Sequence, residues 1–255
     1  MTGEDALSPK TVKAKYLVAV KTVFGAGVRS QLLPDNPAKD VQVRVRKQKV
    51  LRDKGYSGAE AKMILEAAGR IRHDSPRHNE LSKRSIEWGP CIAAHTGARI
   101  SEVMQLRKQD VEQHDGLPCI RITPEAGAVK NGEFRVVPLH RQLIERGLLE
   151  FVQASKDDYL FIKGDEDLAI VRDRAGRAGS MVSKWVREVV GLTDENIQPN
   201  HAWRHRFKTV ARELGEDRLA DAIQGHSDGR AATGYGAHTV RAMNVLIGKM
   251  PAYEV

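Results

Sequence analysis

Cysteine is nearly missing from this chain: its 255 residues include two, Cys91 and Cys119, and neither belongs to a CxxC pair. Two isolated cysteines exclude a disulfide framework and a zinc knuckle, and they fit a reducing compartment. No apolar run reaches the roughly 18 residues of a membrane span. The opening residues, MTGEDALSPK, are polar and acidic, unlike a signal peptide. We therefore expect a cytoplasmic protein, or a nuclear one in a eukaryote, with no membrane partner.

Acidic residues are outnumbered, with 33 Asp and Glu against 41 Lys and Arg, so the net charge is +8. A hydrophobic share of 41% is typical of a soluble globular protein. This length suits one large domain, or one ordinary domain with a fragment of another. The basic excess points weakly to a polyanionic partner such as nucleic acid, and a solvated basic surface explains it equally well.

The first 52 residues read as a small separate region. Ser8 and Pro9 begin a helical pattern that ends in the glycines at 25 and 27, and a proline-containing loop follows. A strongly basic stretch comes next, which is either a solvated linker or a strap that tracks phosphates. Its basic residues are Lys39, Arg44, Arg46, Lys47, Lys49, Arg52 and Lys54. We expect a domain boundary between residues 52 and 53.

The remainder, 53–255, is predicted to be mainly helical with a small β-hairpin, an α+β pattern. Two β-rich segments, 119–123 and 133–138, flank an Asn131–Gly132 turn with Lys130 beside it. The charged, glycine-containing stretch 163–179 is predicted to be an exposed loop. Helices are expected over residues 57–68, 81–95 (with Gly89 and Pro90 bending or breaking it), 99–106, 140–155, 181–190, 199–214, 216–224 and 238–248.

Residues suited to phosphate chemistry gather near the C-terminus. His201, Arg204 and His205 lie within five residues, and His226 and Tyr235 follow in a glycine-rich stretch. Arginine binds phosphate oxygens, histidine transfers protons, and a tyrosine hydroxyl can attack phosphorus. His201 and His205 also have the spacing of a two-histidine metal site, but no glutamate lies between them and no third ligand is evident.

Upstream, Arg99 lies three residues before Glu102, a spacing that also suits an ordinary surface ion pair. Lys130 beside a turn is by itself an ordinary solvated lysine. Each of these residues alone is weak evidence for a function, and the interpretation depends on the pattern that they form together.

Five separated segments resemble the tyrosine recombinases of the phage integrase family. They are HTGARISEVMQL around Arg99, Lys130 followed by RVVPL, HAWRH at 201–205, Gly225 with His226, and Tyr235. The gaps of 22 residues from Arg204 to His226 and of nine from there to Tyr235 are also similar to the family's. The resemblance covers roughly residues 55–255, and the first 50 residues resemble part of a helical core-binding domain.

The resemblance implies that Tyr235 attacks a DNA phosphodiester, forming a 3′-phosphotyrosine and releasing a 5′-hydroxyl. It implies that Arg99, Arg204 and His226 bind the phosphate, that Lys130 protonates the leaving oxygen, and that His201 assists proton transfer from Tyr235. Glu102 and His205 are supporting residues. No ATP is implied, because the covalent intermediate keeps the bond energy. No metal or other cofactor is implied either, because two arginines, a lysine and two histidines act on the phosphate.

The same resemblance implies binding partners and a location in the cell. The partners are double-stranded DNA attachment sites and further copies of this chain, which form a tetramer on DNA and a monomer when free, with an accessory DNA-bending protein in some systems. The location is the nucleoid, and the origin is a bacterium, phage or mobile element. It also implies that the C-terminal helix docks on a neighbouring protomer, and it makes the basic residues from Lys39 to Arg52 DNA contacts. The family's N-terminal clamp usually has more helices, so a truncated or minimal version is expected.

Three other functions remain open at this point. A type IB topoisomerase-like enzyme shares the nicking and closing chemistry. A DNA-binding regulator keeps the fold without turnover. A metal nuclease would use His201 and His205.

Overall fold

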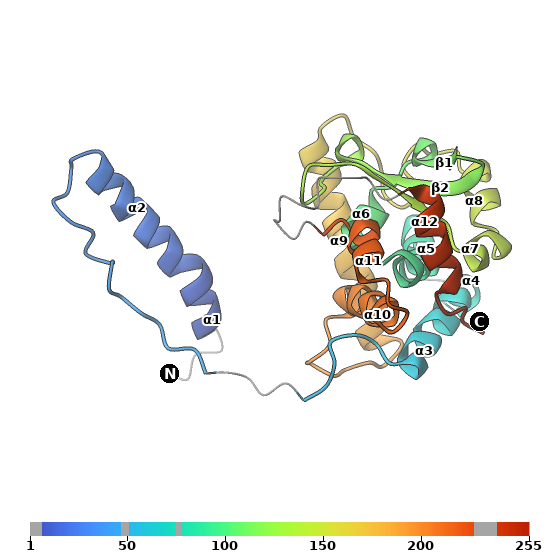
Figure 1. Cartoon of the computed structure of the whole chain (residues 1–255), viewed down its shortest axis with the longest axis horizontal. Helices are drawn as coiled ribbons and strands as arrows, with labels where there is room; N and C mark the ends of the chain where they lie inside the picture. Colours follow the sequence, from blue (N-terminus) through green and yellow to red (C-terminus); the bar gives the residue numbers. More distant parts are fainter. Residues whose placement is uncertain (1–6, 47–50, 75–77, 227–238, 255) are drawn as a thin grey trace. The chain divides into compact units, whose positions relative to one another are not determined.

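The computed structural model of the chain describes residues 7–46, 51–74, 78–226 and 239–254 (Figure 1). Tyr235, Lys47 and Lys49 lie outside these ranges. The contacts within the chain separate two units, residues 1–51 and 52–255. In the described part of the chain, no helix combines the length and apolar character needed to cross a membrane.

Unit 1 is one helical stretch followed by an extended segment. The helix begins at Pro9, capped by Ser8, and runs through α1 (Pro9–Thr11), η1 (Val12–Tyr16) and α2 (Leu17–Arg29). It continues through both glycines at which the sequence predicts its end. The return segment is fixed by Asn36, whose Nδ2 donates to the carbonyl of Lys21 at 3.1 Å. Among the described residues of this unit, Ala38 alone is buried, so unit 1 has no core of its own.

Unit 2 is mainly helical, with a three-stranded antiparallel sheet in the order β1-β2-β3. In Figure 1 the sheet lies at one end of the unit, and α3 and α10 lie at the other. Its helices are α3 (Gly58–Gly69), α4 (Ile71–Asp74), α5 (Glu80–Thr96), α6 (Ile100–Met104), α7 (Arg141–Glu145), α8 (Leu148–Ala154), α9 (Leu168–Glu188), α10 (Pro199–Glu213), α11 (Asp217–Gln224) and α12 (Val240–Lys249), with 3₁₀ turns η2 (Lys108–Asp110) and η3 (Pro124–Ala126).

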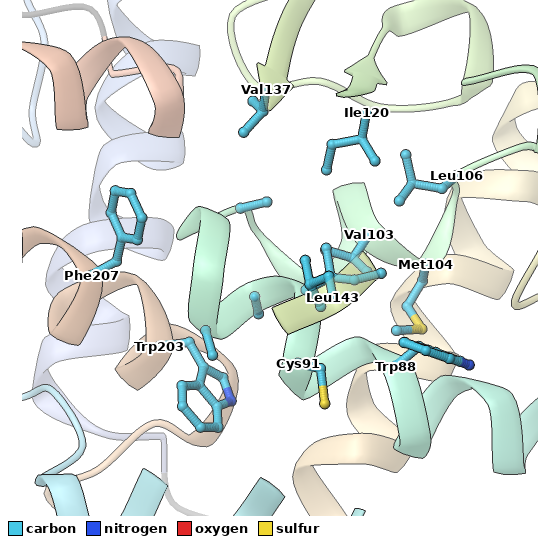
Figure 2. Packing of buried hydrophobic residues seen from close by; sticks show 14 of the residues in the cluster. Trp88, Cys91, Val103, Met104, Leu106, Ile120, Val137, Leu143, Trp203 and Phe207 are labelled. Carbon is cyan, nitrogen blue, oxygen red and sulfur yellow. The ribbon is translucent and has the colours of Figure 1, made fainter. Parts of the chain in front are cut away.

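The central helix of the core is α5, which packs against α3, α6, α9 and α10. It runs unbroken through Pro90, so the predicted interruption there is wrong. The side chain of Met104 fills the space beside Gly89, where a Cβ would lie 2.6 Å from Met104 Cε. Figure 2 shows the buried ring of Trp88 from α5 next to Met104 of α6, with Trp203 and Phe207 of α10 on another side of the core.

The predicted hairpin is confirmed as the pair of β2 (Leu117–Ile122) and β3 (Arg135–Pro138), in a register that sets Ile120 opposite Val137. Its connection is a 12-residue loop that includes η3, and Lys130 lies in a turn within this loop. The sheet also has β1 (Val111–His114), which the sequence reading missed. Asp115 and Gly116, with φ of 53° and 76°, form the two-residue turn that joins β1 to β2.

Two predicted boundaries in unit 2 are wrong. The stretch 163–179 is largely the first half of α9, a 21-residue helix capped by Asp167, whose Oδ1 accepts from the Ala169 N–H at 2.7 Å. Val171, Ala175 and Val182 on this helix are buried at helical spacing. The helix predicted over 140–155 is divided into α7 and α8 by Gly147, which has φ of 90°.

The C-terminal segment packs on its own unit, with α12 lying against β3 and α11. The carbonyl and N–H of Tyr253 bind the amide of Gln142, and its hydroxyl accepts from Arg206 Nε at 2.9 Å. Beneath this contact, the rings of His95 and His140 stack with centroids 4.4 Å apart. Burial, and then the neighbouring His140, lowers the pKa of His95 to about 4.

Candidate active site

Arg99 lies at a sharp change of direction between two helices. Gly97, with φ of 60°, ends α5, and Arg99 is the N-cap residue of α6. Its main-chain N–H donates to Glu102 Oε2 at 3.1 Å, and its guanidinium contacts Glu102 Oε1 at 2.9 Å. The spacing of Arg99 and Glu102 therefore gives a capping interaction that also holds the guanidinium in place.

Glu102 is the electrostatic centre of the site. Its side chain is 1% exposed, and it pairs with both Arg99 and Arg135, the second at 2.5 Å. Burial alone would raise the pKa of Glu102, but the charges and hydrogen bonds of Arg135 and Arg99 bring it below its ordinary value. The carboxylate is therefore ionised at neutral pH and fixes two guanidinium groups.

Arg135, at the start of β3, is a site residue that sequence reasoning missed. Its Nε donates to the carbonyl of Ile223 at 2.9 Å, so it connects the sheet to α11 as well as to Glu102. The backbone of Gly225 passes close by, because a Cβ there would lie 2.9 Å from the Arg135 guanidinium. A charged residue that opens an otherwise apolar strand was the available signal.

Arg204, on α10, is buried, with 7% of its surface exposed. Its two terminal nitrogens each donate to a main-chain carbonyl at 2.6 Å, one of Gly97 and one of Gln224. These carbonyls lie at the C-terminal ends of α5 and α11, where the helix dipole carries partial negative charge. Burial, followed by the charge of Arg99, lowers the pKa of Arg204 to about 9, so the side chain is still cationic at neutral pH.

The two histidines of α10 are exposed and one helical turn apart. Partial burial of the ring, and then the charges of Arg204, Arg99 and Lys130, lower the pKa of His201. Partial burial and Lys54 do the same for His205. His201 therefore faces the cationic cluster as a neutral imidazole that can accept a proton, while His205 faces the start of unit 2.

His226 follows α11 directly and stands beside the same cluster. Its main-chain N–H donates to the carbonyl of Asp221 at 2.8 Å, and its Nδ1 lies 3.2 Å from the Asp221 carboxylate. Partial burial and the charge of Arg204 lower the pKa of His226, while Asp221 opposes the change. Asp221, which also pairs with Lys208 at 2.7 Å, thus orients the ring and is a second residue that the sequence reading did not name.

Lys130 is exposed in the β2–β3 loop. The neighbouring Asn131 donates through Nδ2 to the carbonyl of Gly225 at 3.1 Å, which ties this loop to the segment that carries His226. The charge of Lys130 contributes to the lowered pKa of His201. Five of the six predicted catalytic residues are therefore brought together, and the sixth, Tyr235, lies outside the described residues.

The C-terminal helix that follows Tyr235 in the chain buries its apolar face within the same chain. Val240, Met243, Leu246 and Ile247 are at most 7% exposed, and Val245 faces solvent. In this structure, the apolar side chains expected to dock on a neighbouring protomer are therefore mostly satisfied in their own unit.

The basic residues before unit 2 divide into two groups. Lys39, Arg44 and Arg46 are exposed. Arg52 instead belongs to unit 2, where it pairs with Glu60 at 2.7 Å and with Asp194 at 3.0 Å. The hydrogen bonds that Arg52 donates to both carboxylates raise its pKa. These two ion pairs make Arg52 an anchor of the segment that enters unit 2.

In the described residues, His, Cys, Asp and Glu side chains do not form any group of three that could hold a metal ion. His201 and His205 have no third ligand there. The cationic cluster around Arg99 and Arg204 is instead suited to an anion, and guanidinium groups bind phosphate oxygens in a bidentate manner.

Comparison with known proteins agrees with this geometry. The integrase from mycobacterium phage Brujita is 18% identical, with a TM-score of 0.51 over 99% of this chain and 76% of that one. A lambda integrase (75–356) dimer bound to a COC′ core site is 16% identical, with a TM-score of 0.55 over 91% and 77%. XerH recombinase bound to difH in a pre-cleavage complex is 18% identical, with a TM-score of 0.56 over 96% and 63%.

These structural likenesses, at such low identity, establish the fold. A search of curated proteins found no match to the sequence. The model of the phage integrase family matches residues 58–241, which is most of the chain and includes every candidate catalytic residue. The chain therefore belongs to the phage integrase family of tyrosine recombinases.

Proposed function

We propose that this chain is a site-specific DNA recombinase that cuts and rejoins DNA through a 3′-phosphotyrosine intermediate, integrating or excising a mobile element. The observation that carries the proposal is the pair of anchored guanidinium groups. Glu102 holds Arg99, and two main-chain carbonyls hold Arg204. Fixed cations beside neutral histidines form a receptor for one phosphodiester, and lambda integrase and XerH are recorded bound to DNA.

In the proposed reaction, the hydroxyl of Tyr235 attacks the scissile phosphorus. A bond forms between the tyrosine oxygen and phosphorus, and the bond from phosphorus to the 5′-oxygen breaks. His201 accepts the proton that Tyr235 loses, which its lowered pKa allows because the ring is neutral. Lys130 donates a proton to the leaving 5′-oxygen. Rejoining reverses these steps with the 5′-hydroxyl of a partner strand, and needs neither ATP nor a metal ion.

Arg99, Arg204 and His226 stabilise the charge that develops on the non-bridging oxygens. Because Glu102, Gly97 and Gln224 fix the two arginines before DNA arrives, little reorganisation is needed at the transition state. Removing one such preorganised donor typically lowers the rate by about 10²–10³. His205 and Glu102 act as supporting residues, His205 at the entry to unit 2 and Glu102 through both neighbouring guanidinium groups.

The proposed partners are double-stranded attachment sites and further copies of this chain, with a tetramer on two sites and a monomer when free. An accessory DNA-bending protein is an optional addition. The exposed Lys39, Arg44 and Arg46 contact the DNA backbone, together with Lys47 and Lys49. Residues 1–52 then serve as a DNA-binding region and 53–255 as the catalytic domain, in a nucleoid-associated protein.

The test begins with duplexes selected from a random pool for binding to the full chain. A selected site is then made as a nicked suicide substrate, in which the strand piece beyond the cut diffuses away and traps the covalent adduct. We expect a protein–DNA adduct in denaturing gels, formed in EDTA and abolished by Tyr235→Phe. Its protein must be joined to the 3′-phosphate side.

Each other outcome indicates a different function. Tight binding with no adduct would point to a regulator that keeps the fold without turnover. An adduct on plasmids of any sequence, with supercoil relaxation by the monomer, would indicate a topoisomerase. Loss of cleavage in EDTA would indicate a metal nuclease, and an adduct that survives Tyr235→Phe would overturn the assignment of the nucleophile.

A further inference from the structure

Gln105 places a polar side chain directly beneath the loop that carries Lys130. It follows α6, the short helix that holds Arg99 and Glu102, and its side chain is 1% exposed. The backbone of Gly127 lies on top of it, because a Cβ at Gly127 would be 2.5 Å from Gln105 Oε1 and 2.9 Å from Cδ. Gly127 has φ of 152°, a conformation that favours glycine, so the close approach and the backbone shape occur at the same residue.

The amide of Gln105 has no hydrogen-bond partner among the described residues, at either Nε2 or Oε1. A buried amide normally finds partners, and leaving both of its ends unpaired costs the full desolvation penalty of each. A residue of similar volume such as methionine would fill this position without that cost. The polar side chain of Gln105 therefore destabilises the folded protein in this conformation.

The loop around Gly127 is anchored to the core just before the glycine, and beyond it by the hydrogen bond from Asn131 to the carbonyl of Gly225. The carbonyl of Ala126 accepts from the Tyr159 hydroxyl at 3.1 Å, and the Gly127 N–H donates to the carbonyl of Pro124 at 3.2 Å. Beyond Gly127, the residues from Ala128 to Phe134 are exposed, apart from the partly buried Val129. A rotation of the backbone at Gly127 would move Lys130 and would also turn a peptide group toward the Gln105 amide.

We propose that Gln105 is a positioning residue for Lys130: its amide binds the backbone after Gly127 in the loop conformation that presents Lys130 to the scissile 5′-oxygen. The conformation described above is then the resting one, in which the amide is unpaired. This proposal rests on the proposed function, because it needs Lys130 to be the proton donor. Since Gln105 and Arg99 flank the same short helix, the loop is positioned from the element that also holds the phosphate.

The test separates proton donation from folding by changing the leaving group. A 5′-bridging phosphorothiolate at the scissile position has a sulfur leaving group, which departs without being protonated. We expect Gln105→Met to be as stable as the unmodified protein or more so, because it removes an unpaired polar group. We expect its single-turnover cleavage of ordinary suicide DNA to fall by about 10- to 100-fold, on the scale of one or two lost hydrogen bonds. On the phosphorothiolate it should cleave at the normal rate.

Two companion variants calibrate the measurement. Lys130→Met should show a larger defect that the sulfur substrate also rescues. Gln224→Met should not be rescued, because Gln224 also has an unpaired Oε1 but donates to the Arg204 carbonyl and so acts at the phosphate. Gln105→Asn, which keeps the amide but withdraws it by one methylene, should repeat the rescued defect if Gln105→Met fails to fold.

The outcomes are distinct. Normal cleavage of ordinary DNA by Gln105→Met would overturn the proposal, and so would a defect that the sulfur substrate leaves in place while Lys130→Met is rescued. If Lys130→Met itself is not rescued, the assignment of Lys130 as proton donor fails, and the role of Gln105 fails with it. Absence of any adduct from the unmodified protein would instead refute the proposed function as a whole.

Discussion

Replacing Glu102 by glutamine removes the charge that holds two guanidinium groups in the site. The carboxylate is buried and pairs with Arg99 and Arg135, whose side chains are 17% and 11% exposed. Removing one partner of a buried ion pair costs about 3–5 kcal/mol. The arginines here keep some access to solvent, and the amide can still accept a hydrogen bond, so we expect Glu102→Gln to lower the free energy of unfolding by about 2–4 kcal/mol.

The assay is thermal and urea unfolding of the full chain. For a domain of this size, the expected loss corresponds to a decrease in Tm of about 5–15 °C. A double-mutant cycle with Arg135→Gln should show coupling of at least about 1 kcal/mol, because the second substitution removes a cation that Glu102→Gln leaves unpaired. Cleavage should also fall, by about 10-fold or more, since Arg99 loses its anchor.

The pH dependence gives an independent check. Because the folded-state pKa of Glu102 is below its ordinary value, its contribution to stability is present above the unfolded pKa of about 4.3 and is lost as the pH falls through the folded value. The stability difference between the unmodified protein and Glu102→Gln should therefore shrink below about pH 4. A change in Tm under about 2 °C with additive effects in the cycle would refute the view that this carboxylate holds the site together.

Three further predictions concern other regions. Because the pKa of His95 is lowered from 6.5 to about 4 in the folded state, protonation favours the unfolded state as the pH falls from about 6.5 to 4. The free energy of unfolding should therefore be lower at pH 5 than at pH 8 by about 2 kcal/mol, and His95→Gln should lack this difference. Arg44→Gln should reduce the slope of log K for DNA binding against log salt by about 0.9, while Arg52→Gln lowers unfolding stability and leaves the slope unchanged. Gly97→Ala, with φ of 60° and a Cβ 2.4 Å from a neighbouring side chain, should lower Tm far more than Gly116→Ala, which has φ of 76° and open space.

The candidate site residues Arg99, His201 and Arg204 could be found from the sequence because each lies in a short segment whose spacing is set by local structure. Arg99 and Glu102 form a capping interaction within one turn, and Pro199 marks the start of the helix that carries His201 and Arg204. Such relations are encoded within a few residues and survive without knowledge of the rest of the fold.

The partners of these residues were not predictable, because they come from distant parts of the chain. Arg135 reaches Glu102 only after β3 pairs with β2, and Arg204 reaches Gly97 across more than 100 residues. The charge that opens the apolar segment RVVP marks Arg135 as unusual, but nothing local identifies the carboxylate that it reaches. Tertiary packing decides that contact, and spacing along the sequence does not contain it.

Two errors in secondary structure have local causes. The stretch 163–179 contains glycines and many charges, which favour a loop, but Val171 and Ala175 lie one turn apart and the glycine at 179 lets Ile100 pack closely, with a prospective Cβ 2.9 Å from it. The missed turn at Asp115 and Gly116 is a strong hairpin signal in its own right. The turn signal is present in the sequence, but β1 (VEQH) is four residues long and partly exposed, so it shows no alternating apolar pattern of a strand.

The site has an excess of positive charge when no DNA is bound. Three guanidinium groups, those of Arg99, Arg135 and Arg204, are held by one carboxylate and by the carbonyl ends of two helices. Helix ends supply only partial charge, about half an electron each, so the cluster keeps an excess of positive charge. Burial, and after it this excess charge, lowers the pKa of Arg204 and of His201, and a bound phosphodiester would relieve the contribution of the charge. We therefore expect DNA binding to raise both pKa values, so that His201 becomes a better proton acceptor only once the phosphate is in place.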